Sequence, residues 1–271
     1  MQDLTDRSSH FEFGLNWELF SKLIDSGRIA AAEESLSSLG LDVAGRRFLD
    51  IGSGSGLFSL AALRRGAEFV LAVDIDENSV RSTQHLLKMS APGERWRTED
   101  LSVFDLSPSR HGKFDVVYSW GVLHHTGDMW RAVATAAEMV EEGGVLALAI
   151  YERTPLCGFW RHEKRVYAKS PHWVQTVGRY TFLSAYVAAL TLSGRNPFRK
   201  RVRRRGMDMM HDIHDWLGGY PYESTTTDEL EAFLVPRGFE RVLVRPVTVH
   251  LWGLFGSGCS EYVYRKIATN A

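Results

Sequence analysis

Three glycines alternate with other residues directly after an apolar segment near position 50. They are Gly52, Gly54 and Gly56. Asp50 precedes them, and a second apolar segment, Phe69–Val73, leads to Asp74 about 20 positions further on. Glycines let the backbone pass close to a ligand, and an acid at the end of the second strand can accept hydrogen bonds from ribose hydroxyls. This spacing predicts a nucleotide-binding turn between a strand and a helix.

The glycine spacing separates two kinds of nucleotide site. A dinucleotide-binding turn places its third glycine three residues after the second, and Leu57 occupies that place here. The pattern D-x-G-x-G-x-G instead resembles motif I of the class I methyltransferases that use S-adenosylmethionine (SAM). The resemblance implies that the turn receives the methionine end of SAM, that Asp74 holds the ribose hydroxyls and that Ile75 also contacts the cofactor. The turn residues implied to bind are Asp50, Gly52, Ser53, Gly54 and Gly56.

A later segment, Lys113–Thr126, strengthens this resemblance. It reads K-F-D-V-V-Y-S-W-G-V-L-H-H-T and resembles the strand-four motif of the methyltransferase subfamily that includes ubiquinone-biosynthesis enzymes. By that resemblance Ser119 and Trp120 line the methionine moiety, whereas Ser102 and Val103 lie near the adenine. Motifs at 13–17, 211–221 and 258–262 resemble a group of bacterial SAM methyltransferases, although this resemblance names no acceptor.

Histidines are the candidates for proton transfer. Methyl transfer from a sulfonium is an in-line displacement, and an acceptor hydroxyl or protonated amine must also lose a proton. Histidine is the usual proton acceptor near neutral pH. The candidate residues are His124, His211 and His214. His125 is adjacent to His124, and neighbouring helical residues point about 100° apart, so at most one of this pair is expected to face the methyl group. A structural role for both stays open.

A dense polar cluster, H-D-I-H-D-W, occupies residues 211–216 and precedes a Gly-Gly turn. Three interpretations stay open: a divalent metal site, acid–base chemistry or hydrogen bonding to the acceptor, and a structural turn. No known metal-ligand spacing is matched, so no metal is predicted. The residues expected to contact the acceptor are Asp212, Asp215, Tyr220 and Glu223.

Strands and helices alternate in the segment that carries these motifs. Apolar runs predict strands at 48–51, 69–73, 114–119 and 145–151, and helical spacing predicts helices at 57–65, 78–89 and 127–142. Asn78 is the expected N-cap of the second of these helices. The alternation predicts a doubly wound, Rossmann-like α/β fold with a mostly parallel sheet of about seven strands and ligands at its carboxyl edge.

The predicted strands and helices divide the chain into four parts. Residues 1–45 are expected to form a helical cover, with helices at 16–25 and 28–39, and residues 46–151 the SAM-binding core. Residues 152–223 are an insertion, and residues 224–271 complete the core sheet. Because the insertion follows the fifth strand at the ligand-binding edge, we expect it to cap the substrate.

Composition is that of an ordinary globular protein, with 271 residues, 44% hydrophobic, 24% charged and a net charge of −1. That net charge attracts neither nucleic acid nor an anionic membrane, so no stable nucleic-acid complex is expected. Two cysteines, Cys157 and Cys259, and no apolar leader at 1–14 favour a reducing cytoplasm. The uncharged stretch 180–194 is too short to span a bilayer.

A basic run at 195–205 permits several functions. It is a solvated loop, a membrane-surface element that recruits a lipid acceptor, or a site for the phosphates of a nucleotide sugar, a carrier protein or RNA.

Together these features predict a SAM-dependent methyltransferase. It would modify O or N of a small-molecule acceptor and release S-adenosylhomocysteine (SAH). The alternatives are a lipid, carrier-bound or nucleic-acid acceptor recruited by the basic run, and a non-catalytic SAM-binding protein. A nicotinamide-dependent oxidoreductase is disfavoured by Leu57.

Overall fold

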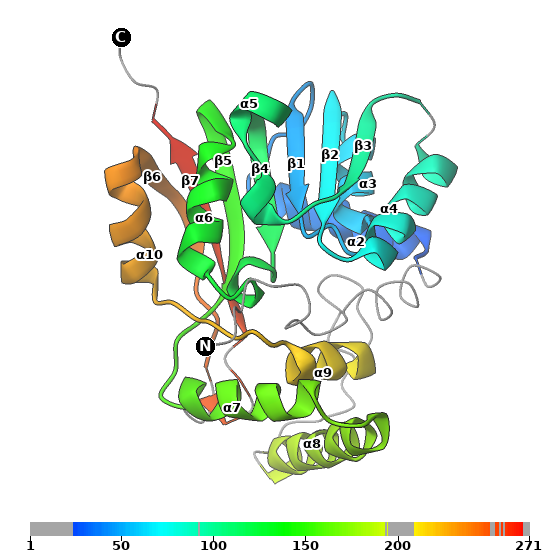
Figure 1. Ribbon diagram of the computed structural model, residues 1–271, viewed down its shortest axis with the longest axis vertical. Helices are drawn as coiled ribbons and strands as arrows, with labels where there is room; N and C mark the ends of the chain where they lie inside the picture. The colour runs from blue at the N-terminus through cyan, green and yellow to red at the C-terminus, as the bar shows by residue number, and fades with distance from the viewer. Residues whose placement is uncertain are drawn as a thin grey trace.

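The computed structural model describes residues 24–91, 93–192, 194, 209–249, 253–254, 256 and 258–267 (Figure 1). Most of the expected helix at 16–25 and the whole basic run at 195–205 lie outside the described residues. The helix expected at 28–39 is present as α2 (Ser26–Ser38). Its N-cap is Asp25, whose side chain accepts a hydrogen bond from the backbone N–H of Arg28.

The described strands form one sheet. They are β1 (Arg47–Ile51), β2 (Phe69–Asp74), β3 (Trp96–Asp100), β4 (Phe114–Trp120), β5 (Val140–Tyr151), β6 (Phe239–Arg245) and β7 (Cys259–Lys266). Their order is β3-β2-β1-β4-β5-β7-β6, with every neighbouring pair from β3 to β5 parallel. β7 runs antiparallel to both β5 and β6. The predicted mostly parallel, seven-stranded sheet is therefore confirmed.

Helices cover both faces of the sheet. The first face carries α2, α3 (Leu57–Arg64) and α4 (Glu77–Ser90), and the second carries α6 (Met129–Glu138) and α10 (Thr227–Leu234). Short helical turns lie between these elements: η2 (Val103–Asp105), α5 (Pro108–His111), η3 (Leu123–His125) and η4 (Val235–Arg237). Successive strand residues point to opposite faces, so Phe48 packs on the first face, with α2 to α4, and Leu49 on the second, with α6 and α10. Figure 1 shows α6 in front of the strands and α2 behind them.

Two helix boundaries expected from the sequence are wrong. The N-cap of α4 is Asp76, which accepts from the N–H groups of Asn78 and Ser79, so Asn78 is already inside the helix. The helix expected over 127–142 ends at Glu138, because Val140 already pairs with Phe114 in the sheet. Both errors shift a helix end by a few residues, because several adjacent residues could begin or end the helix and contacts distant in sequence select among them.

Gly144 explains why β5 continues through residues that look like a helix end. The β4–β5 register shifts between Phe114 and Val116, and a Cβ on Gly144 would lie only 2.8 Å from the carbonyl oxygen of Asp115. A glycine is therefore required where the irregular strand approaches its neighbour.

The segment after β5 forms three helices at the carboxyl edge of the sheet. They are α7 (Cys157–Ala168), α8 (His172–Leu192) and α9 (Met209–Gly218), drawn below the strands in Figure 1. Trp160, Ile213 and Leu217 belong to a small core that these helices form with Tyr222. Within the described ranges, no helix is long and apolar enough to cross a membrane. The boundaries of the four predicted parts stay a prediction.

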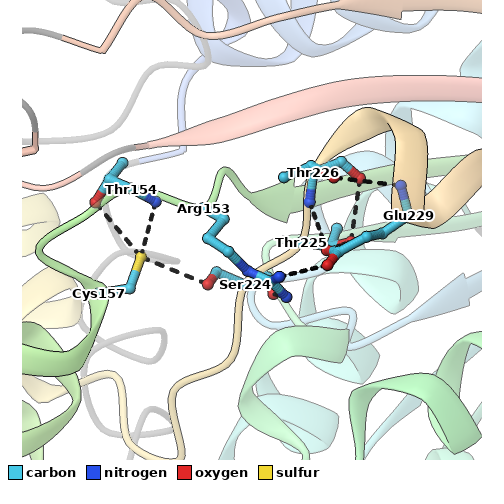
Figure 2. Close-up of polar contacts among 7 residues, drawn as sticks. All are labelled: Arg153, Thr154, Cys157, Ser224, Thr225, Thr226 and Glu229. Carbon is cyan, nitrogen blue, oxygen red and sulfur yellow. Dashed lines mark hydrogen bonds and ion pairs between the residues drawn. The ribbon is translucent and has the colours of Figure 1, made fainter.

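An extended segment ties these helices back to the sheet (Figure 2). Thr225 donates its N–H to Tyr151 and accepts one from Arg153, both at 3.0 Å, so it runs alongside the end of β5. The Arg153 guanidinium reaches both Glu229 and the carbonyl of Ser224.

Cys157, the first residue of α7, joins the segment after β5 to the segment that leads into α10. Its sulfur accepts hydrogen bonds from the N–H of Thr154, at 3.1 Å, and from the hydroxyl of Ser224, at 3.5 Å, as Figure 2 shows. Burial opposes ionisation of the thiol, but hydrogen bonds from Ser224, Thr154 and Tyr222 outweigh burial and lower the pKa of Cys157.

We predict that Thr226→Ala destabilises the fold by about 1 kcal/mol, because Thr226 caps α10. Its hydroxyl accepts from the N–H of Glu229, and the Glu229 side chain accepts from the N–H of Thr226, which is a complete capping box. Urea unfolding measures the loss. Thr191→Ala, which removes an exposed hydroxyl bonded within α8, is the control and is expected to change stability by less than about 0.5 kcal/mol. Equal effects of the two changes would contradict the capping role.

Candidate functional site

A cavity of about 370 Å³ opens at the carboxyl edge of the sheet. Its walls include the ends of four parallel strands (β1, β2, β4 and β5), the segment that follows β3, and the start of the antiparallel strand β7. Of the residues predicted to bind a ligand, these line it: Asp50, Gly52, Ser53, Gly54, Asp74, Ile75, Ser102, Val103 and Trp120. Parallel strands end together, so residues distant in sequence meet there.

The glycine turn after β1 is held against two other segments. A Cβ on Gly52, where φ is 79°, would lie 2.3 Å from a methyl carbon of Val122, so only glycine fits beneath the loop that follows β4. The N–H of Gly54 donates to Asp74 Oδ2 at 2.9 Å. The turn and the end of β2 are thereby fixed relative to each other before any ligand binds.

Asp74 stands where β2 ends. Its Oδ1 accepts from the N–H of Asp76 at 2.9 Å, and its Oδ2 from Gly54. Burial is the main cause that raises the pKa of Asp74 to about 6, with Asp76 and Asp100 adding repulsion and the two N–H donors opposing it. The carboxylate is therefore positioned by backbone groups and is charged at neutral pH.

Asp50 lies deeper, in β1. It is buried, and its Oδ2 accepts from the Ser59 hydroxyl at 2.6 Å. Burial raises the pKa of Asp50 to about 7; the Ser59 hydrogen bond lowers it, and the charge of Asp74 raises it further. Ser59 belongs to α3, so this contact also fixes the helix that the glycine turn begins.

Two predicted ligand residues do not line the cavity. Ser119 is buried and donates its hydroxyl to the carbonyl of Ile51 at 3.0 Å, which joins β4 to β1. Gly56 is the N-cap of α3 and faces α4, where Thr83 lies. Ser119 therefore holds β4 to the end of β1, and Gly56 packs against α4.

The far end of the cavity is aromatic. Tyr151 from the end of β5 makes an edge contact with Trp216 of α9, with ring centroids 5.1 Å apart, and both line the cavity. His125, Thr126 and Cys259 complete this end. Behind the Trp216 ring, the Nζ of the buried Lys164 lies 3.5 Å from the ring centroid.

The two adjacent histidines have different environments. His125 lines the cavity, whereas His124 is fully buried beside Tyr151, at a ring-centroid distance of 4.0 Å. Burial, and after it the nearby His125 and Lys164, hold the pKa of His124 well below its usual value. The candidate base His124 therefore lies behind the residues that line the cavity and does not line it itself.

The cluster from the insertion is only partly described. The side chains of His211, Asp212 and Asp215 lie outside the described residues. His214 does not line the cavity, and its Nδ1 lies 2.9 Å from the Tyr167 hydroxyl. Tyr220 is buried away from the cavity lining. No group of side chains suited to a metal occurs among the described residues.

Glu223, predicted to contact the acceptor, bonds to the loop after β4 and does not line the cavity. Its Oε2 accepts from the N–H of Met129, the first residue of α6, at 2.9 Å. Its own N–H donates to the carbonyl of His124 at 2.9 Å. Burial raises the pKa of Glu223, and the Met129 hydrogen bond opposes that rise.

Comparison with known proteins agrees with this geometry. Residues 49–146 match the family described as "Methyltransferase domain". The ubiquinone biosynthesis O-methyltransferase of Psychrobacter arcticus is 29% identical over 141 residues, which are 52% of this chain and 53% of that protein. The chain spans only about half the length of the relatives that it matches in sequence.

Solved structures of methyltransferases share the fold of this chain. An S-adenosylmethionine-dependent methyltransferase from Mesorhizobium loti has a TM-score of 0.54 at 18% identity, covering 87% of this chain and 97% of that one. Magnesium protoporphyrin IX methyltransferase from Synechocystis PCC 6803, solved with bound SAH, has a TM-score of 0.52 at 16% identity, covering 88% and 81%. At such identities the likeness establishes the fold alone.

The cavity also includes residues that were not predicted from the sequence to line it. The position of Tyr151 could have been predicted, because it is the last residue of the predicted strand 145–151, at the ligand-binding edge. Trp216 and Cys259 belong to the motifs at 211–221 and 258–262, but those motifs did not predict that either residue lines the cavity, since that depends on where α9 lies and on the direction of β7.

We predict that Asp50→Asn flattens the pH dependence of stability. The folded-state pKa of about 7 exceeds the unfolded value near 3.8, so the folded protein binds more protons between them, and wild type loses stability as pH rises through 7. The slope from this group reaches about −1.4 kcal/mol per pH unit. Urea unfolding from pH 5 to pH 8 measures it, with the exposed Asp105→Asn as the charge-loss control. Parallel curves for wild type and Asp50→Asn would contradict the assignment.

Proposed function

We propose that this protein is a SAM-dependent methyltransferase that transfers a methyl group to O or N of a small molecule. The observation that carries the proposal is the single cavity in which the glycine turn and Asp74 meet an aromatic and histidine-bearing end. A donor and an acceptor held in one cavity are aligned for direct transfer, and alignment supplies much of the rate.

The donor end suits SAM by the chemistry of its side chains. Asp74 offers a carboxylate to the ribose hydroxyls, and the residues of the Leu101–Phe104 segment offer an apolar surface to the adenine. The glycine turn and Trp120 would take the methionine portion. SAM supplies the methyl group already activated on a positive sulfur. The matched methyltransferase family, and a fold neighbour solved with SAH, support this assignment.

The acceptor end is formed by Tyr151, Trp216, Cys259 and His125. The P. arcticus relative is named as an O-methyltransferase, which favours a hydroxyl acceptor. The insertion contributes Trp216 through α9, in keeping with a substrate-capping role. A cytoplasmic location, and the roles of His124, His211, His214 and the neighbouring acids, stay predictions.

Two experiments test the proposal. Calorimetry with SAM and with NAD separates the methyltransferase from an oxidoreductase. Incubation with methyl-tritiated SAM and a panel of hydroxyl and amine compounds, followed by extraction, separates an enzyme from a protein that only binds SAM. A lipid or nucleic-acid acceptor would be revealed by label in those fractions of a cell extract.

We predict that Asp74→Ala weakens SAM binding by roughly 2–3 kcal/mol, because it removes a charged acceptor of two hydroxyl hydrogen bonds. Calorimetry at pH 7.5 measures the change, and Gly54→Val is expected to be worse because its side chain would intrude on the ligand. Glu77→Ala is the control, since it removes an exposed carboxylate at the start of α4. Unchanged SAM affinity in Asp74→Ala would remove the basis of the site assignment.

SAM affinity should also fall in acid. With a pKa of about 6, Asp74 loses its charge as pH drops from 7 to 5, and the Kd is expected to rise by about tenfold if only the charged form binds. The Asp74→Asn variant should bind weakly at both pH values and show little of this dependence. A wild-type Kd that stays constant from pH 7 to pH 5 would exclude the charged carboxylate as a ligand group.

A further inference from the structure

The indole ring of Trp216 borders the cavity and is packed on its other sides by protein atoms. The Nζ of Lys164 lies 3.5 Å from its ring centroid, and the Trp160 ring makes an edge contact at a centroid distance of 5.5 Å. Tyr151 and Tyr222 make further edge contacts, with centroids 5.1 Å and 6.2 Å away. The position of this one ring therefore determines how much room the proposed acceptor end has.

Gly256 lies directly against this ring. It belongs to the connection between β6 and β7, and its φ is 86°. A Cβ at this position would lie 2.2 Å from Cζ2 of Trp216 and 2.7 Å from both Cε2 and Cη2. Carbon atoms in contact are about 3.5 Å apart, so any side chain at position 256 would require the ring or the connection to move by about 1 Å or more.

The connection is held in place by contacts to the start of α7. The carbonyl of Gly253 accepts from the indole N–H of Trp160 at 2.7 Å and from the N–H of Gly256 at 3.0 Å. A Cβ on Gly253 would lie 2.5 Å from Oγ1 of Thr154, a residue drawn in Figure 2, so the connection also lies directly against the segment that leads into α7. These contacts oppose a movement of the connection, whereas the cavity gives the Trp216 ring space into which it can move.

We propose that Gly256 is a specificity-determining residue, which sets the width of the acceptor end by leaving room for Trp216 outside the cavity. This role rests on the proposed methyl transfer. It implies an upper limit on the size of the acceptor group next to the methylated atom, and a single methyl group added at position 256 lowers that limit. In an apolar pocket one methylene changes the discrimination between ligands by about 10- to 200-fold, so the effect is measurable.

The width can be measured without an acceptor. In the proposed arrangement the group on the sulfur of SAM points from the donor end to the acceptor end, so SAM analogues that carry ethyl or propyl in place of methyl probe that space. Calorimetry on Gly256→Ala should give a Kd for SAM within about threefold of wild type. The Kd for the larger analogue that wild type binds should rise at least about tenfold.

Gly238→Ala is the matched control. Gly238 has a φ of 82°, and apart from its chain neighbours no described residue places an atom within 4 Å of a Cβ built there. The change therefore brings the same backbone strain without a clash and should leave the ratio of the two Kd values unchanged. The double variant Gly256→Ala/Trp216→Phe should restore the wild-type ratio, because Phe lacks the part of the indole that meets Gly256.

The movement of the ring has a readout of its own. In protein labelled with 5-fluorotryptophan, the ¹⁹F resonance of Trp216 is the one that Trp216→Phe removes from those of the eight tryptophans in the chain. This resonance should shift in Gly256→Ala and keep its position in Gly238→Ala. An unshifted Trp216 resonance in Gly256→Ala, or a Kd ratio equal to that of wild type, overturns the proposal.

The outcomes separate this role from the proposed function. If Gly256→Ala does not fold, Trp216→Phe alone decides: a wider acceptor end should lower the Kd of the larger analogue, relative to that of SAM, at least about tenfold, and an unchanged ratio overturns the proposal. Wild-type protein that binds neither SAM nor SAH overturns the proposed function itself. SAM binding with a ratio that none of these variants changes overturns the role of Gly256 and leaves the methyltransferase proposal intact.

Discussion

The register of the parallel strands β1, β2 and β4 determines where the loops that line the cavity begin. Ile51 of β1 pairs with Val73 of β2 on one side and with Ser119 of β4 on the other, so the three strands end at one level. The glycine turn, Asp74 and the loop after β4 therefore emerge side by side. The N–H of Gly54 then bonds to the Asp74 carboxylate, and the N–H groups of Gly52 and Ser53 bond to the carbonyl of Val73.

A second constraint acts on the other end of the cavity. The extended segment that leads into α10 bonds to the loop after β4 through Pro221 and Glu223, and to the end of β5 through Thr225. Helices α7 to α9 precede this segment, so the same few bonds position Trp216 relative to His125. The proposed acceptor end depends on long-range contacts, whereas the proposed donor end is built from consecutive βα units.

This difference explains what could be predicted from the sequence. The glycine turn, Asp50 and Asp74 lie in one βαβ unit, where spacing alone fixes relative position, and Asp50, Asp74 and the first part of the turn, Gly52–Gly54, line one cavity. The prediction of Glu223 rested on its neighbours in sequence, yet Glu223 bonds to Met129 and His124, far along the chain. Choosing between His124 and His125 required the direction of each side chain in a three-residue turn, which no periodicity supplies.

The reversed direction of β7 has consequences for how such a protein can diverge. An antiparallel strand begins at the edge where the parallel strands finish, so the chain must return to the cavity before it enters the sheet at Cys259. The connection from β6 to β7 and the one that leaves β5 thus both arrive at the acceptor end. Both connections lie outside the strand pairs of the sheet. Substrate choice can therefore change over evolutionary time while the donor end and the hydrophobic layers are inherited unaltered.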